Sequence, residues 1–284
     1  MMVRYVTSGA TSVTERSLVG VGIVLFVLWN TAPLAWLVTS SLMHQQALTT
    51  TPPDFSPASF TLSNYTEVFN SAAQLGRGLL NSIIIAVGTT ALSIVLGAPA
   101  AYALARLPLP GRDHLLLMVL AAQMFPAVVV VIPLFIAASK LGLIDTRISL
   151  ILVYLTFNLP VVIWVLRGFF LGVPKGLERA AEVDGASTWQ TFRLIVLPIS
   201  LPALFAASVF AFIEAWNEFF FALIMTRQES QTVPLVISAF AGQYQTLFGQ
   251  MMAAAAISIA PVVFLAILLR KTILSGFADG MLKG

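Results

Sequence analysis

The segment GLERAAEVDGAS, from Gly176 to Ser187, holds four charged residues within seven positions. The chain around it is different in kind, because 58% of its 284 residues are apolar, only 10% are charged and its mean hydropathy is +0.93. Soluble domains carry about 25% charged residues. The composition therefore predicts an all-α, polytopic membrane protein in which this segment forms a polar island. Its charged residues are Glu178, Arg179, Glu182 and Asp184.

Apolar stretches long enough to cross a bilayer flank the segment on both sides. A helix needs about 20 residues to span about 30 Å of hydrocarbon. We therefore predict six transmembrane helices within a single membrane domain, residues 1–284. The first apolar run is too long for the core of a cleaved signal peptide, so we expect it to remain as an anchor. The stretches are residues 17–43, 78–105, 115–139 and 148–166, and two more near 200–225 and 250–269.

Lysine and arginine predict the orientation, because these residues resist translocation and mark the cytoplasmic side. With both termini in the cytoplasm, inner segments carry eleven of the fifteen. This asymmetry accounts for the net charge of +3 without a nucleic acid partner. The chain is thus expected to be a multi-pass protein of the cytoplasmic (inner) membrane. The inner residues are Arg4, Arg16, Arg106, Arg112, Arg167, Lys175, Arg179, Arg193, Arg270, Lys271 and Lys283, and the outer ones are Arg77, Lys140, Arg147 and Arg227.

The inner loop that contains the polar island, about residues 167–198, is longer than a reversal of direction requires. Leu177, Ala180 and Ala181 recur at i, i+3 and i+4, which predicts a two-turn helix with one small apolar face. Glu178 and Glu182 fall on the polar side of this predicted helix.

Two residues after this pattern predict how the loop continues. We expect Gly185 to end the first helix in the left-handed region, and Ser187 to cap a second helix. The apolar residues of that second helix, Trp189, Phe192 and Val196, are expected to face the membrane surface.

A helix of two turns is marginally stable alone, so it needs a surface against which to pack. Its alanines allow close approach, and its charges suit the rim of a groove on another protein. The alternative is a solvated loop with incidental helicity, and the periodicity by itself leaves both interpretations open.

The spacing within the loop resembles the EAA motif of permease subunits in binding-protein-dependent ABC importers. That motif reads Glu-Ala-Ala, three residues, Gly, nine residues, Ile, one residue, Leu. Here Ala180 and Ala181 are followed at the same intervals by Gly185, Ile195 and Leu197. The chain departs from the motif at Arg179, which stands in the glutamate position between the nearby acids.

The resemblance covers nearly the whole chain. AWNEF at residues 215–219, FTLSNYTEVF at 60–69 and GFADGMLKG at 276–284 are similar to segments of the carbohydrate branch of this family. The short outer loops are similar to those of the smaller of the two maltose permease subunits.

The resemblance implies a type I permease fold with six helices and a cytoplasmic coupling helix that docks on an ATPase. It implies import of a sugar, a di- or oligosaccharide, together with a second permease subunit, two ATP-binding-cassette ATPases and an extracytoplasmic sugar-binding protein or lipoprotein. The sequence lacks a Gly-x-x-x-x-Gly-Lys-Ser/Thr phosphate loop, so ATP and Mg²⁺ are expected on the partner ATPases and the chain is not expected to be an enzyme. The coupling residues would be Leu177, Glu178, Arg179, Ala180, Ala181, Glu182, Asp184 and Gly185.

A second group of polar residues lies within the fifth apolar stretch. Placing a carboxylate at membrane depth costs about 2.5 kcal/mol or more, so Glu214 and Glu218 are expected to face a polar cavity or a partner. With Asn217 and Trp216 they are candidates for a sugar path, and the alternatives are a structural hydrogen bond or an interfacial position. Lone amides often bond only a neighbouring helix, which makes the remaining candidates weaker. These are Asn81, Gln123 and Asn158.

Two other classes of function compete with an importer subunit. A proton-coupled secondary transporter would use Glu214 and Glu218 as proton carriers. An intramembrane hydrolase would need a nucleophile beside a base, and His44 and His114 lie near helix ends, so no catalytic residue is predicted. Because the chain has no cysteine and these histidines are isolated, no metal site is predicted either. The absence of Lys and Arg at membrane depth favours a neutral sugar over a phosphorylated one.

Overall fold

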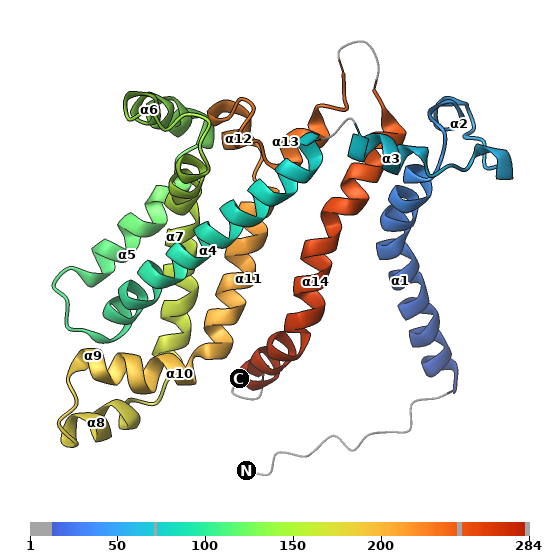
Figure 1. Cartoon of the computed structure of the whole chain (residues 1–284). Coiled ribbons are helices and arrows are strands. Elements are labelled where there is room, and N and C mark those ends of the chain that lie inside the picture. Colours follow the sequence, from blue (N-terminus) through green and yellow to red (C-terminus); the bar gives the residue numbers. More distant parts are fainter. Residues whose placement is uncertain (1–12, 71–72, 243–245, 282–284) are drawn as a thin grey trace. The chain divides into compact units, whose positions relative to one another are not determined.

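The computed structural model describes residues 13–70, 73–242 and 246–281, and the elements of this part of the chain are helices and isolated β-bridges (Figure 1). Arg4 and Lys283 lie outside the described residues, as do the side chains of Arg16, Arg270 and Lys271. The chain forms two compact units, Met1–Val68 with Ala241–Ile257 and Phe69–Phe240 with Ser258–Gly284. Each unit is described by itself.

The first unit contains the amino-terminal helix and the outer segment that follows it. Its elements are α1 (Val13–Ser41), α2 (Gln45–Thr49), η1 (Pro57–Ser59), α3 (Ser63–Asn70) and the first turns of α14 (Phe248–Met281). Asn64 is buried and its side-chain amide donates to the carbonyls of Ser41 (2.9 Å) and Met43 (2.8 Å), which ties the beginning of α3 to the end of α1. Along its apolar length α1 buries nothing within the structure, as a helix in contact with lipid would.

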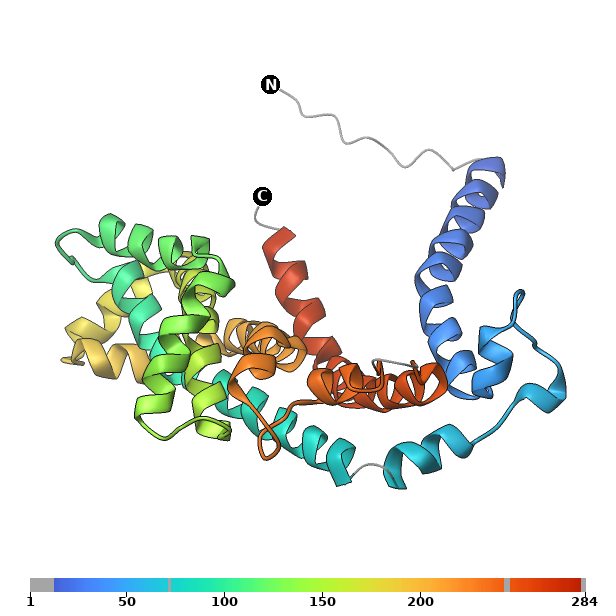
Figure 2. The same ribbon diagram turned by 90° about the horizontal axis from the view of Figure 1, so that it is seen from above.

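The second unit is a helical bundle built on α4 (Ala73–Arg106), α7 (Arg147–Gly172) and α11 (Leu201–Asn217), which pack against one another (Figures 1 and 2). Glycine in α4 permits this packing. A Cβ atom at Gly88 would lie 2.8 Å from Cδ1 of Ile151, and one at Gly97 would lie 2.9 Å from Cγ1 of Val162. Small residues let membrane helices approach closely, so these positions fix the spacing of α4 and α7. The remaining elements between residues 107 and 240 are α5 (Arg112–Ala121), η2 (Ala122–Met124), α6 (Ala127–Lys140), α8 (Lys175–Val183), α9 (Thr188–Thr191), η3 (Phe192–Val196), α10 (Leu197–Ile199), α12 (Phe220–Met225) and α13 (Val233–Ser238).

The spans agree with the prediction in number but not in continuity. In the described residues four helices are long and apolar enough to cross a membrane, and two bent pairs bring the number to six when each pair is counted as one span. The third predicted helix bends by 94° between Arg112–Met124 and Ala127–Lys140, where Pro126 interrupts the backbone hydrogen bonds. The second bent pair joins Thr188–Ile199 to Leu201–Asn217 at 77°. The fifth predicted helix also stops short of Met225, since α11 ends at Asn217 and α12 begins at Phe220.

Candidate functional site

The polar island folds as predicted, as α8 followed by a left-handed glycine. Gly185 has φ +80°. Its N–H donates to the carbonyl of Glu182 (3.1 Å), and the N–H of Ala186 donates to the carbonyl of Ala181 (2.9 Å). This pair of bonds is a Schellman motif, which satisfies the last carbonyls of the helix. The end of α8 is therefore fixed by a residue that tolerates positive φ.

The second short helix also begins where predicted. Ser187 accepts a hydrogen bond from the N–H of Gln190, and the Gln190 side chain accepts one from the N–H of Ser187, which completes a capping box. The expectation that its apolar residues face the membrane surface is wrong for two of them. Phe192 and Val196 are buried in the core between α4 and α7, and the ring of Tyr102 lies 4.9 Å from that of Phe192. Trp189 is exposed.

The face that α8 presents outward differs from the predicted one. Ala181 is only 5% exposed and packs within its own chain, so it does not belong to the free face. Leu177 is 41% exposed, Val183 is 88% exposed, and Ala180 lies between them on the same side of the helix. These three residues, called here the outer face of α8, form a small apolar surface bordered by charges. Sequence reasoning missed Val183.

Glu178 attaches α8 to the bundle, although the periodicity placed it on the polar side. Its Oε1 lies 2.8 Å from Nε of Arg106 at the end of α4, as an ion pair without the alignment of a hydrogen bond. The side chains are 14% and 5% exposed. Its Oε2 accepts from the hydroxyl of Tyr102 (3.3 Å), and Arg106 also donates to the carbonyl of Val173. We call Tyr102, Arg106 and Glu178 the α8 anchor.

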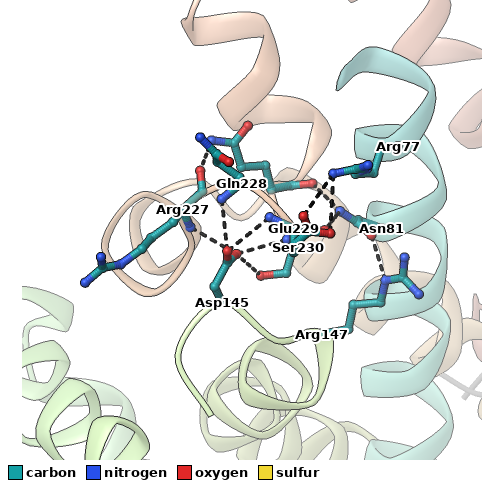
Figure 3. A network of polar contacts seen from close by, with 9 residues as sticks. Arg77, Asn81, Asp145, Arg147, Arg227, Gln228, Glu229 and Ser230 are labelled. Carbon is teal, nitrogen blue, oxygen red and sulfur yellow. Dashed lines mark hydrogen bonds and ion pairs between the residues drawn. The ribbon is translucent and has the colours of Figure 1, made fainter. Parts of the chain in front are cut away.

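A polar network lies at the opposite end of the bundle, next to α12 and α13 (Figure 3). Asn81 is fully buried and donates to the carbonyls of Glu229 and Gln231, both at 2.9 Å, while its own carbonyl accepts from Nε of Arg147 (2.7 Å). Arg77 pairs with the carboxylate of Glu229 at 3.4 Å. Asn81 therefore positions the loop after α12.

Asp145 organises the same loop. Its carboxylate accepts from four successive backbone N–H groups, those of residues 227–230, at 3.0 to 3.1 Å, and from the hydroxyl of Ser230 at 3.0 Å. Burial raises the pKa of this carboxyl, but the backbone donors outweigh burial and hold the pKa well below its usual range. Asp145 itself adopts φ +61°, which an aspartate tolerates better than most residues. The loop is thus held by a charged group that stays ionised at neutral pH.

Arginines from both predicted groups lie at these two ends of the bundle. Arg77, Arg147 and Arg227 gather at the end with Asp145 (Figure 3). Arg106 lies at the other end, beside α8. These three members of the predicted outer group and this member of the predicted inner group thus lie at opposite ends of one bundle, and the end that faces the cytoplasm stays a prediction.

The four predicted path residues have different environments. Glu218 lies in the break between α11 and α12, and its carboxylate accepts from the N–H groups of Phe221 (2.9 Å) and Ala222 (3.2 Å), so it caps α12. Trp216 is 4% exposed and stacks on Phe212 with ring centroids 5.6 Å apart. Asn217 is exposed, and its amide donates to the carbonyl of Ile213 (3.0 Å).

Glu214 is exposed and lies one turn before Glu218 on the helical repeat, at the edge of a cavity of about 160 Å³. The cavity brings together the two weaker amide candidates, Gln123 and Asn158, with this carboxylate. The other lining residues are Phe157, Val161 and Phe210. Three polar side chains that are far apart in the sequence thus line one cavity.

Residues 93–276 match the family described as binding-protein-dependent transport system inner membrane component. This range includes α8, Gly185 and the residues that line the cavity. The chain belongs to this family. It is 36% identical over 275 residues to the trehalose/maltose transport system permease protein MalG of Thermococcus litoralis, covering 96% of this chain and 98% of that one. It is also 36% identical over 255 residues to the trehalose transport system permease protein SugB of Mycobacterium tuberculosis, covering 89% and 92%.

The fold has a counterpart among solved structures. A chain of a bacterial ABC transporter involved in the import of the acidic polysaccharide alginate matches with a TM-score of 0.74 and 24% identity, over 94% of this chain and 100% of that one. The predicted type I permease fold of an ABC importer is confirmed. The chain is thus a multi-pass inner-membrane permease component that works with a binding protein.

Proposed function

We propose that the chain is one of two different permease subunits in an importer that carries a neutral di- or oligosaccharide across the cytoplasmic membrane, with both termini inside. The relatives named for trehalose and maltose support a sugar substrate. Two partner ATPases would bind ATP and Mg²⁺, and an extracytoplasmic sugar-binding protein or lipoprotein would deliver the substrate. We also propose that residues 1–284 act as a single membrane domain.

The exposure of the outer face of α8 is the observation that supports a role in coupling to the ATPases. A two-turn helix with exposed Leu177 and Val183 is not stabilised by its own length, so it needs the anchor behind it and a partner in front. We assign the ATPase groove as that partner. Arg179, Glu182 and Asp184 are exposed around the face and would lie at the rim of the groove.

The α8 anchor would transmit a displacement of the docked α8 to the helices of the bundle. Because Glu178 joins α8 to Arg106 and Tyr102 at the end of α4, a displacement of α8 is passed to a helix that packs against both α7 and α11. An ATPase can drive transport only if it binds one arrangement of the permease better than another. The outer face of α8 provides contacts that differ between the two arrangements.

The path would run along the exposed side of α11. Glu214 and Asn217 present polar groups there, while Trp216 and Glu218 support them by packing and by capping α12. Asn217→Ala should lower sugar uptake several-fold in a complex that still assembles with its ATPases. Unchanged uptake by this variant would assign Asn217 to structure alone.

The energy source separates this proposal from a proton-coupled secondary transporter. The complex is reconstituted in liposomes with its binding protein, and uptake of radiolabelled trehalose and maltose is measured with ATP inside and then with a proton gradient alone. We expect uptake that needs ATP and the binding protein and that survives collapse of the gradient. Uptake driven by the gradient without ATP would favour the secondary transporter.

A further inference from the structure

The cavity between α7, α11 and η2 is lined by hydrogen-bond acceptors that have no donor among the residues that the structure describes. Gln123 donates from Nε2 to the carbonyl of Phe157 (2.6 Å), which leaves its own carbonyl oxygen open to the cavity. Asn158 is 6% exposed and donates to the carbonyl of Tyr154 (3.3 Å), while its Oδ1 is buried without a partner. Glu214 makes no hydrogen bond or ion pair with any residue that the structure describes.

A buried acceptor without a donor is unfavourable, because it has lost its hydrogen bonds to water. Oδ1 of Asn158 is such an acceptor, and the exposed Gln123 and Glu214 add two further open acceptors at the same cavity. A ligand or water that supplies donors would satisfy all three. The open groups of Gln123, Asn158 and Glu214 are all oxygen atoms that accept. The complementary ligand is rich in hydroxyl donors.

The surrounding backbone supports a polar cavity at this depth. Gln123 belongs to η2, directly before the 94° bend that divides the third span. Irregular backbone at membrane depth is tolerated where it is buried in protein or lines a water-filled cavity. Phe157 and Phe210 supply apolar walls, which suit the C–H faces of a sugar ring.

We propose that Gln123, Asn158 and Glu214 form a sugar-binding site within this subunit, which accepts hydrogen bonds from the hydroxyl groups of a neutral sugar ring during its passage. None of the six described residues that line the cavity is cationic, and Glu214 repels negative charge. A uronate or a sugar phosphate would bury its anion beside this carboxylate without compensation. The site thus selects neutral rings, and it rests on the proposed sugar-import function.

The test uses the complete reconstituted importer and whichever of trehalose and maltose the wild-type complex takes up. Glu214→Ala and Gln123→Ala each remove one acceptor from an exposed position, so neither is expected to prevent folding. The matched control is Ser208→Ala on the same helix, because the Ser208 hydroxyl is already satisfied by the carbonyl of Leu204 (2.7 Å). Uptake and binding-protein-stimulated ATP hydrolysis are measured together for each variant.

We expect Glu214→Ala to lower uptake at subsaturating sugar about tenfold, as for loss of a hydrogen bond to a charged group, while stimulated hydrolysis stays within about twofold of wild type. Glu214→Gln keeps one acceptor and should recover part of the uptake. Ser208→Ala should behave as wild type.

The outcomes separate this site from the function on which it rests. If the wild-type complex takes up neither sugar in a binding-protein-dependent manner, the proposed function and this site fail together. If wild type transports and both Glu214→Ala and Gln123→Ala transport equally well, the site is overturned and the function stands. Equal loss of uptake and of stimulated hydrolysis in Glu214→Ala would also overturn the site, because it would indicate a general structural defect.

Discussion

Replacing Glu178 by alanine is expected to release α8 from the end of the bundle. Removing one partner of a buried ion pair costs about 3–5 kcal/mol, because the other charge is left without compensation. The Glu178 side chain is 14% exposed, and Arg106 keeps its bond to the carbonyl of Val173. We therefore expect the replacement to destabilise the attachment of α8 by about 3 kcal/mol, near the lower limit of this range. This cost corresponds to about a hundredfold increase in the population of detached α8.

Trypsin can report this detachment directly. Lys175 and Arg179 lie within α8, and cleavage after either residue requires local opening of the helix. In inside-out membrane vesicles that contain the permease without its ATPases, cleavage of Glu178→Ala should be about a hundredfold faster than that of wild type when opening is rapid relative to cleavage. The double replacement Arg106→Gln with Glu178→Gln should be cleaved more slowly than the two single effects predict, because they share one interaction.

The control is Glu182→Ala, which removes an exposed carboxylate from the same helix. Glu182→Ala should change the free energy of α8 opening by no more than about 0.5 kcal/mol, which is about twofold in the rate of trypsin cleavage. If Glu178→Ala were cleaved no faster than Glu182→Ala, the α8 anchor would not hold the helix, and the proposed transmission to α4 would be refuted.

Three further changes test the ends of the bundle. Val183→Asp places a charge on the outer face of α8 and should abolish binding-protein-stimulated ATP hydrolysis while membrane insertion stays normal, whereas hydrolysis at wild-type strength would exclude this face from docking. Gly185→Val forces a β-branched residue to φ +80° at a cost of about 1–2 kcal/mol, so trypsin cleavage of α8 should accelerate about tenfold, and an unchanged rate would contradict the strain. Asp145→Asn should lower the thermal stability of the purified permease at neutral pH. Because the folded pKa of Asp145 lies below its usual value near 3.8, the stabilisation is present above that value and is lost as the pH falls from there toward the folded pKa. The difference in Tm between wild type and Asp145→Asn should therefore shrink only in strong acid, and a difference that disappears near neutral pH would contradict this assignment.

The sequence predicted those features that depend on local patterns. Gly185 and Ser187 act at helix ends, where one residue type and its neighbours decide the geometry, and the structure confirms both. The six apolar spans followed from composition, since length and hydropathy are sufficient to recognise them. The site residues as a functional set stay a prediction.

Features that depend on partners far away in the chain could not be read from local patterns. Glu178 and Ala181 share one side of α8, and periodicity does not tell that Arg106 and Tyr102 lie beneath that side. Val183 was overlooked because an apolar residue is ordinarily assumed to be buried, yet it is 88% exposed.

The breaks in the third and fifth spans were not predicted, because the apolar stretches continue across them in the sequence. Pro126 lies at the break in the third span, but proline in a membrane helix does not by itself determine a bend of 94°. Glu218 is a predicted path residue, and its carboxylate also caps the amino-terminal end of α12. The cavity around Glu214 required the fold, since its three polar residues come from three different elements.

The central claim is that the outer face of α8 contacts an ATPase, and the absence of cysteine from this chain allows a direct measurement. Val183→Cys provides a single thiol, which is labelled with a maleimide carrying a benzophenone before assembly and irradiated in the complete complex. We predict an adduct between this chain and an ATPase subunit, and none from Phe55→Cys in the outer segment. Failure of Val183→Cys to form the ATPase adduct in a complex that still hydrolyses ATP in response to the binding protein would contradict the account.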